Sequence, residues 1–412
     1  MKVALVVNRF PVLSESFIVR LAQSLDQDGI GLSVYALNGF DEPLLQRLSP
    51  YLWDRVRSGD VAVHYPAGSH RGGRLRIISL ILHAIFSLFL SPLYSLEMAW
   101  RGLRFRSIIG ALTYHRLSHG NSHDVVHAQF LTMAVPVVAA HRILGTNPCV
   151  TIVSYVRGYD VTKIGAVASG ELTMIKNANR LDGICSVSKS LAARLADLGL
   201  GDIPSEIIYS GIPVTALRYS GDRATLGSAV TFVQVGRMVE KKGHDLSLKM
   251  LAALDDSSTL SFVGDGPLRA ELELLAGTLG LSHRVTFHGS KTHQESIDII
   301  SASTFMLAPS RTAADGDSEG IPNVVKEAMA LGVVCIGSDH SGIPEIISDE
   351  VTGFLFKEND VQSFLSTVRK AMADSDALGR IAISSRELVE REFDSDKTSS
   401  RLRDFYRRAI SR

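Results

Sequence analysis

The sequence predicts an α/β protein with two doubly wound parallel sheets that face each other across a cleft. Short runs of β-branched residues alternate with amphipathic stretches along the chain, the pattern of parallel strands covered by helices on both faces. The length of 412 residues fits two or three domains. A loop-forming stretch at 212–228 divides the candidate strands into two sets, and we place the domain boundary there.

Each set of candidate strands is large enough for one open sheet. We expect a first domain at 1–212 and a second at 228–412, whose last helices can cross back to the first domain. The first-domain strands are expected at 3–7, 32–37, 61–65, 124–127, 150–155, 183–187 and 206–209. The second-domain elements are expected as strands at 230–235, 260–263, 285–288, 304–307 and 333–336 and helices at 361–373, 378–393 and 397–410. Ligands of such sheets bind at the carboxyl ends of the strands, so strand-to-helix loops are expected to carry function.

Composition and charge exclude several classes of protein. Apolar residues make up 45% of the chain and charged residues 21%, which fits a globular protein and excludes a disordered one. Lys plus Arg and Asp plus Glu both total 43, so no net charge favours nucleic acid as a partner. Cys149, Cys185 and Cys335 lie far apart with no metal-binding spacing, which argues against a disulfide framework or a zinc site and favours the cytoplasm.

The first apolar run, at 3–7, is too short for a signal peptide and predicts a buried strand. A longer apolar run at 77–96 carries no formal charge and is flanked by Arg residues at 71–76 and 101–106. A membrane span there would put strands of one sheet on opposite sides of the bilayer, so we reject it. Two interpretations stay open for this helical insertion near 71–118: buried core helices, or an element at 71–106 that docks on an anionic membrane surface.

The richest strand-to-helix loop runs from Ser310 into a helix that contains Glu327. Pro322 suits the first turn of that helix, and a strand, a glycine-containing loop and a helix N-terminus together form an anion site. Glu319 and Glu327 are eight residues apart, a little over two helical turns, so Glu327 is expected to lie roughly under the loop that holds Glu319. Two carboxylates placed in this way can accept hydrogen bonds from the hydroxyls of a sugar and a ribose. The alternative is that Glu327 is an exposed helix carboxylate and Glu319 a favourable first-turn charge.

A second loop, at 236–244, contains Arg237 and Lys242. An Arg fork and a Lys point charge suit the binding of a diphosphate and its neutralisation as it leaves. The alternative is a solvated turn of mixed charge. Between the two loops, Gly264 to Pro267 forms a further turn that lacks the third glycine of a dinucleotide fingerprint, and no Walker A motif is present, so the chain is a poor candidate for an NAD enzyme or an ATPase.

These motifs together resemble family 4 of the retaining glycosyltransferases. The E-x7-E motif from Glu319 to Glu327 is preceded by Gly236-Arg237 with Lys242-Gly243 and by Gly264-Asp265-Gly266-Pro267, and it is followed by Gly342-Ile343-Pro344-Glu345. The first half is a looser match: the segments 10–18 and 124–130 resemble the branch that builds bacterial exopolysaccharides, including colanic-acid-type enzymes.

The resemblance implies a GT-B fold of two Rossmann-like domains, with a nucleotide-sugar donor held by the second domain and the acceptor by the first. Carried over to this sequence, it makes Arg237 and Lys242 the groups that stabilise the leaving diphosphate and Glu319 the ligand of donor-sugar hydroxyls. Glu327 would bind the ribose. The remaining donor-binding positions would be Gly236, Gly264 and the segment Gly320, Ile321, Pro322, Asn323 and Val324, whose amides would face the sugar or the phosphates.

The first domain supplies candidates for acceptor or phosphate contacts: Ser14, Glu15, His127, Arg157 and Asp160. Many members of the family carry His at the position of Arg157, and an arginine cannot exchange a proton near neutral pH. Asp315-Gly316-Asp317 spells the metal-binding D-x-D of a different fold, but its surroundings match the metal-independent class, so we predict no metal site and no cofactor.

We therefore predict a cytoplasmic, retaining hexosyltransferase, peripheral at the inner membrane, that extends a saccharide or lipid-linked saccharide acceptor in exopolysaccharide biosynthesis. A sugar-nucleotide epimerase of the same architecture and a non-catalytic sugar-nucleotide-binding partner are the alternatives. The sequence does not identify the base, the sugar, the linkage or the oligomeric state.

Overall fold

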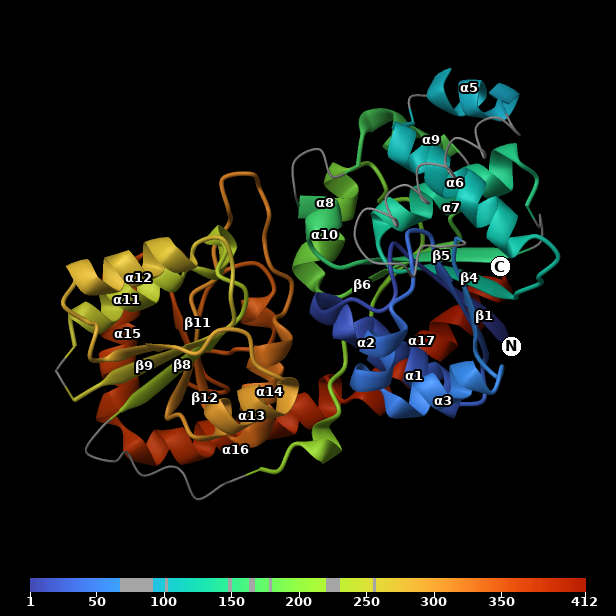
Figure 1. Cartoon of the computed structure of the whole chain (residues 1–412). Helices are drawn as coiled ribbons and strands as arrows, with labels where there is room; N and C mark the ends of the chain where they lie inside the picture. Colours follow the sequence, from blue (N-terminus) through green and yellow to red (C-terminus); the bar gives the residue numbers. More distant parts are fainter. Residues whose placement is uncertain are drawn as a thin grey trace.

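The computed structural model describes residues 1–66, 92–100, 103–146, 150–162, 167–177, 180–219, 230–254 and 257–412. Two parallel sheets, each covered by helices on both faces, form two domains that lie side by side (Figure 1). This is the doubly wound α/β class that the sequence predicts.

The first sheet has the strand order β3-β2-β1-β4-β5-β6-β7, and every pairing in it is parallel. The chain starts in the middle of this sheet, winds to one edge through β3 and then returns past β1 to build the other edge. Its strands are β1 (Lys2–Val7), β2 (Gly31–Ala36), β3 (Ala62–His64), β4 (Val125–Ala128), β5 (Thr151–Val156), β6 (Gly183–Ser186) and β7 (Ser205–Ile207).

The second sheet repeats this winding with the order β10-β9-β8-β11-β12-β13. It too is parallel in every pairing. Its strands are β8 (Thr231–Val235), β9 (Thr259–Val263), β10 (Val285–Phe287), β11 (Phe305–Ala308), β12 (Val334–Ser338) and β13 (Phe354–Phe356).

Helices follow the strands in alternation, as parallel connections require. The first domain contains η1 (Leu13–Glu15), α1 (Ser16–Gln27), α2 (Glu42–Leu48), α3 (Pro50–Arg57), α5 (Pro92–Trp100), α6 (Phe105–Ser118), α7 (Leu131–Ile143), α8 (Tyr159–Thr162), α9 (Ser169–Asn177) and α10 (Lys189–Asp197). The linker holds η2 (Val214–Ala216), and the second domain contains η4 (Glu240–Lys242), α11 (His244–Ala252), α12 (Arg269–Thr278), α13 (His293–Ser301), α14 (Asn323–Leu331), η5 (Ile343–Glu345), α15 (Val361–Ala373) and α16 (Ser375–Glu392).

The last helix, α17 (Ser395–Ile410), belongs to the core of the first domain although it follows the second domain in sequence. Helix α16 runs beneath the second domain, and the chain then crosses so that both termini lie in the first domain (Figure 1). At the crossing, the Ile212 amide donates to the Phe393 carbonyl at 2.8 Å, and the Ser395 amide donates to the Ile212 carbonyl at 2.9 Å.

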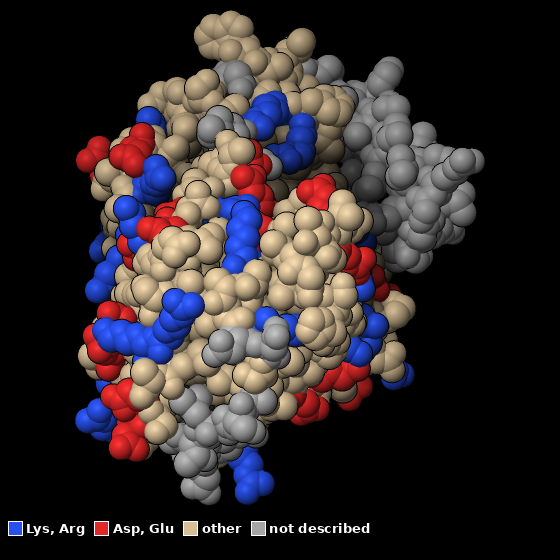
Figure 2. Space-filling view, turned by 90° about the vertical axis from the view of Figure 1, so that its left-hand side faces the viewer, with Lys and Arg blue, Asp and Glu red and all other residues tan. Residues whose placement is uncertain are grey.

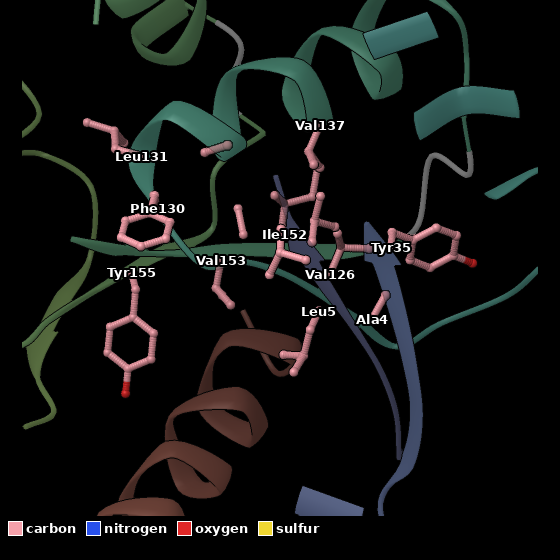
Figure 3. Close-up of a cluster of buried hydrophobic side chains, with 14 of the residues drawn as sticks. Ala4, Leu5, Tyr35, Val126, Phe130, Leu131, Val137, Ile152, Val153 and Tyr155 are labelled. Carbon is pink, nitrogen blue, oxygen red and sulfur yellow. The ribbon is translucent and has the colours of Figure 1, made fainter. Parts of the chain in front are cut away.

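One face of the first sheet is closed by α7 and the other by α17. In Figure 3, Val137 of α7 lies above the sheet, whereas Leu5 and Val153 point toward α17 on the opposite face. His127 pairs in register with both of these residues, so it shares their face and is fully buried. Its Nδ1 lies 2.6 Å from the hydroxyl oxygen of Tyr406 on α17, which is also fully buried.

The surface carries charges of both signs. Lys and Arg side chains are interspersed with Asp and Glu side chains over the outer face of the second domain (Figure 2). Within the described ranges, no helix combines the length and the apolar character that crossing a bilayer would require.

All twelve strands predicted from the sequence are present, and β13, which has only three residues, was missed. Most of the apolar run at 77–96 lies outside the described residues, and its described part belongs to α5. The stretch 220–229 in the boundary region and Cys149 also lie outside them. Cys185 and Cys335 are buried and free.

We predict that Tyr406→Phe destabilises the first domain while leaving its ring packing intact. The substitution removes a buried hydroxyl and leaves the His127 ring without its partner, which costs about 1–3 kcal/mol of unfolding free energy. Urea unfolding followed by circular dichroism measures this. Tyr219→Phe is the control, because no described residue forms a hydrogen bond with its hydroxyl. Equal stability of the two variants would contradict the prediction.

Candidate active site

Loops at the carboxyl ends of the second-domain strands converge at the edge of the second domain that faces the first domain. The loop after β8 carries Arg237 and Lys242, and the loop between β11 and α14 carries Glu319. The two loops are joined by their backbones: the Arg311 amide donates to the Lys241 carbonyl at 2.9 Å. They therefore form one wall of an interdomain site at the strand edge where doubly wound sheets bind ligands.

Glycines allow these loops to pack backbone against backbone. A Cβ atom on Gly264 would lie 2.1 Å from the carbonyl oxygen of Gly236, and one on Gly243 would lie 2.0 Å from that of Pro309. Both Gly264 and Gly243 also have positive φ, +130° and +63°. A Cβ on Gly236 would lie 3.2 Å from Cε of Lys242, so this glycine leaves room for the lysine side chain.

Glu319 is held between two lysines. Its carboxylate lies 3.3 Å from Nζ of Lys242 and 3.4 Å from Nζ of Lys241, and Lys241 also pairs with Asp317 at 3.0 Å. Burial favours a raised pKa for Glu319, but the two lysines outweigh it and hold the pKa below its ordinary value. In the same way, Glu319 and Asp317 outweigh the effect of burial on Lys241 and raise its pKa. Glu319 is therefore an ionised acceptor.

Arg237 is exposed at the rim of the same loop. Among the described residues, its guanidinium has no hydrogen-bond or ion-pair partner. Of the two cations predicted to hold the diphosphate, Arg237 is thus unpaired within the described structure, whereas Lys242 is already paired with Glu319.

The N-terminus of α14 opens into the site. Pro322 is its N-cap and supplies no side-chain acceptor, so the first-turn amides are uncapped. The prediction that the amides of Ile321 to Val324 face the ligand needs a correction at Pro322, because proline has no N–H. Ile321 and Pro322 are themselves buried, and a Cβ on Gly320 would lie 3.3 Å from Cγ2 of Val187 in the first domain. Asn323 and Val324 are half-buried, so their amides are more open to an anion than that of Ile321.

Glu327 is buried, with a relative exposure of 5%, so it is not the exposed helix carboxylate of the alternative interpretation. Its Oε1 lies 3.0 Å from Nε2 of His293, which α13 presents at the surface. Lys326, next to it on α14, is buried as well, and its Nζ donates to the Ser210 carbonyl at 2.8 Å and to Oδ1 of Asn323 at 2.9 Å. Burial lowers the pKa of Lys326 to about 7.

Arg157 forms the first-domain wall opposite α14. Its guanidinium carbon lies 4.0 Å from the ring centroid of Tyr155 and 4.4 Å from that of Phe17, so the group is sandwiched between two aromatic rings. Nη1 donates to the Ser210 hydroxyl at 2.8 Å and Nη2 to Oε1 of Gln129 at 3.1 Å.

The other first-domain candidates have different surroundings. Asp160 is buried and accepts hydrogen bonds from the amides of Leu131, Arg157 and Gly158 at 2.9–3.0 Å, so it organises the loop and not a ligand. His127 is not available as a contact for acceptor or phosphate, because it is completely buried against α17. Burial, together with Arg157, lowers its pKa well below the ordinary value.

Glu15 is half-buried at the end of η1, and burial raises its pKa although Arg157 opposes the shift. Ser14 lies in the same turn. Glu15 therefore flanks the Arg157 wall. The D-x-D carboxylates have partners inside the protein: Asp317 pairs with Lys241, and Asp315 accepts the Asp317 amide at 3.1 Å. In the part of the chain that the structure describes, no group of three or more His, Cys, Asp or Glu side chains is arranged to hold a metal.

Glu345 joins the two domains across the site. Its carboxylate accepts the amides of Lys189 and Ser190, at 2.8 and 2.9 Å, at the N-terminus of α10 in the first domain. It also accepts the hydroxyl of Tyr209 at 3.2 Å. A carboxylate at a helix N-terminus is favoured by the helix dipole, so this contact stabilises the approach of the two domains.

Sequence reasoning missed three residues of this site: Lys241, His293 and Lys326. Lys241 could have been found, because it stands next to Lys242 in a loop already selected for its charge. The other two lie on α13 and α14, and nothing in their local sequence indicates their contacts with Glu327 and Ser210.

The arrangement of the two domains defines the class. The chain resembles sucrose-phosphate synthase from Thermosynechococcus elongatus with a TM-score of 0.73 and 17% identity, over 100% of this chain and 99% of that one. It resembles the Anabaena protein HepE, solved in complex with UDP, with a TM-score of 0.71 and 17% identity, over 98% of this chain and 99% of that one. The chain therefore has the GT-B fold, as predicted.

Residues 200–388 match the profile of the family Glycosyl transferases group 1. The chain thus carries a group 1 glycosyltransferase domain, which confirms the resemblance that its motifs predicted.

Two curated relatives lie in the exopolysaccharide branch. A Salmonella typhimurium protein named as a colanic acid biosynthesis glycosyltransferase, WcaL, is 28% identical over 227 residues, 54% of this chain and 56% of the relative. The amylovoran biosynthesis glycosyltransferase AmsK of Erwinia amylovora is 33% identical over 175 residues, 42% of this chain and 43% of the relative. The chain therefore spans about half the length of the curated relatives it matches.

We predict that Glu345→Gln loosens the domain contact. The amide cannot match the charge-assisted hydrogen bonds to Lys189 and Ser190, so the contact weakens by about 1–3 kcal/mol. Small-angle X-ray scattering should show a larger radius of gyration than for the unmodified protein. Glu350→Gln is the control, because Glu350 pairs only with Lys370 at the surface among the described residues. Identical scattering curves for both variants would refute this role of Glu345.

Proposed function

We propose that the protein is a retaining glycosyltransferase that moves a sugar from a nucleoside-diphosphate sugar to a saccharide acceptor in exopolysaccharide biosynthesis. One observation carries the proposal. The Lys241–Glu319–Lys242 cluster and the uncapped N-terminus of α14 lie together at the strand edge that faces the first domain. Cations and free amides suit a diphosphate, and an ionised carboxylate between them suits sugar hydroxyls.

The donor half of the site follows from these contacts. The diphosphate would bind Arg237, Lys242 and the amides of Asn323 and Val324. Glu319 would accept hydroxyls of the donor sugar, with Lys241 still holding it. Glu327, fixed by His293, would accept the ribose hydroxyls.

In the reaction, the bond between the anomeric carbon and the leaving phosphate oxygen breaks, and its electron pair goes to the nucleoside diphosphate. An acceptor hydroxyl forms the new bond on the same face, and its proton goes to the departing phosphate. Negative charge develops on the diphosphate during this step, so preorganised cations and amides stabilise the transition state more than the ground state. The residues supply this charge without a metal ion, and we propose metal-independent transfer.

The relatives support the acceptor class. WcaL and AmsK are named for the synthesis of two exopolysaccharides, and this favours a growing saccharide as the acceptor over the isomerisation of a free sugar nucleotide. An epimerase would turn over without an acceptor. Release of nucleoside diphosphate only when an acceptor is present therefore distinguishes the two.

We predict that one of UDP, GDP, ADP and TDP raises the melting temperature of the protein and that Lys242→Met abolishes the rise. A ligand that binds only the folded state at about 100 times its Kd stabilises the protein by about 2.7 kcal/mol. Arg237→Ala should weaken the effect in the same direction.

Lys249→Met is the matched control, because Lys249 is an exposed lysine of the same domain, paired with Asp245. It should respond like the unmodified protein. A melting temperature that none of the four nucleotides changes would overturn the donor site.

We further propose that the enzyme works at the inner face of the membrane and reaches a lipid-linked acceptor through α5 and the start of α6. Leu96, Trp100 and Phe105 have relative exposures of 67%, 88% and 64%, and the exposed Arg106 lies beside them. Apolar side chains with adjacent cations suit an anionic lipid surface.

We predict that Trp100 enters anionic lipid. The chain has two tryptophans, so Trp53→Phe leaves Trp100 as the only fluorophore of its kind. Its emission should shift to the blue with vesicles of phosphatidylcholine and phosphatidylglycerol, and not with phosphatidylcholine alone. Trp100→Ser should reduce co-sedimentation with the anionic vesicles. Emission that is the same with both vesicles would argue against docking through α5.

A further inference from the structure

A cavity of about 40 Å³ lies at the domain junction, behind the Arg157 wall. Its volume exceeds the roughly 10–15 Å³ that one water molecule needs. It lies between α1, the end of β5, the linker and the start of α17. Its lining includes Phe17, Arg20, Arg157, Ser210 and Thr398.

Arg157 lines the cavity with part of its hydrogen-bonding capacity unused. A guanidinium has five N–H donors. The contacts to Ser210 and Gln129 use one on each terminal nitrogen, and the buried Nε has no partner in the described structure. The guanidinium lies between the rings of Phe17 and Tyr155, and this stacking fixes the plane of the group. The orientation of its unused N–H donors is therefore fixed as well.

Arg20 lines the same cavity from α1. Its Nε is buried without a partner, and no described side chain accepts a hydrogen bond from its guanidinium or pairs with it. Burial lowers its pKa, although the charge of Glu327 opposes the shift. Glu327 is not within ion-pair distance of Arg20 and is bonded to His293 instead.

The local charge balance leaves these cations without close counter-ions. Lys326, which is fully buried, adds a third cation to these two half-buried arginines. It bonds to the carbonyl of Ser210, whose hydroxyl accepts from Arg157. The nearby carboxylates are Glu15, Asp160 and Glu327, and in the described structure none of them forms an ion pair with any of the three cations. Buried cations with unused donors are costly unless a counter-ion meets them.

We propose that this cavity binds a small oxyanion, a phosphate or carboxylate group carried by a substrate, between the guanidinium groups of Arg20 and Arg157. Two guanidinium forks match the geometry of an oxyanion, and the volume suits a group of that size. The cavity adjoins α14 through Ser210 and Lys326, so a substrate in the cleft can reach it. The further statement that the acceptor substrate carries this anion rests on the proposed glycosyltransferase function.

The test is isothermal titration calorimetry of the full chain with two anions, inorganic phosphate and glucuronate, and with glucose as the neutral sugar. Saturable binding of phosphate identifies a phosphate group as the source, and saturable binding of glucuronate identifies an acidic sugar. Glucose should not bind to this cavity. Arg20→Gln should weaken the binding of the anion at least about tenfold, because charge-assisted hydrogen bonds are lost. Arg20→Lys should retain part of it.

Arg47→Gln is the matched control, because it removes one exposed positive charge from α2 of the same domain. It should bind the anion like the unmodified protein. Arg20 bonds to no described side chain, so Arg20→Gln should keep or raise the melting temperature and should keep the nucleotide response of the unmodified protein. Repeating the titration in Lys242→Met separates the cavity from the proposed diphosphate site.

Absence of saturable binding by both anions, or unchanged binding in Arg20→Gln, would overturn the proposal. Failure of the nucleotide panel together with Arg20-dependent anion binding would leave the cavity site standing and remove the donor site. A nucleotide response without Arg20-dependent anion binding would rule out the cavity site and leave the donor site standing.

Discussion

The cleft depends on a short crossing where the chain passes between the domains twice. Ile212 bonds to Phe393 and Ser395 through its amide and its carbonyl, so the linker and the last helix are tied at one point. The packing there is tight enough that a Cβ on Gly211 would lie 2.2 Å from Oγ1 of Thr398. Because α17 completes the core of the first domain, the crossing cannot loosen without exposing apolar surface from that core. The two strand edges therefore meet in a restricted set of orientations.

Within this frame, the second-domain wall is organised before any ligand arrives. Glu319 is ionised and held by two lysines, and the loops that carry these residues are joined backbone to backbone through glycines. A group fixed in this way needs little reorganisation when charge develops nearby, which is the condition for electrostatic stabilisation of a leaving group. The first-domain wall is fixed by a different means, because aromatic stacking and neutral acceptors hold Arg157 and leave part of its charge available.

Sequence reasoning succeeded where the relevant information is local. Strand alternation predicted both sheets, and the structure brings two of the predicted site residues, Glu319 and Lys242, to within 3.3 Å of each other. It failed at His127, because the face of a strand that becomes buried depends on what covers it, and here the cover is α17, which lies 279 residues further along at Tyr406. Arg20 was missed for the same reason: on an amphipathic helix, an arginine that lines a cavity built by segments distant in sequence has the same local pattern as a solvated one.

The contacts across the cleft imply that ligand binding and domain approach are linked. Glu345 connects the second domain to α10, while Arg157 and Lys326, one from each domain, meet at Ser210 in the linker. A substrate that bridges both walls binds this arrangement better than one in which the walls have separated. By thermodynamic linkage, the substrate shifts the equilibrium toward the state in which the two domains are close together. The size of this shift is set by the ratio of the substrate's affinities for the close and the separated states. Weakening the Glu345 contact therefore lowers substrate affinity even though Glu345 touches neither Lys242 nor Arg20.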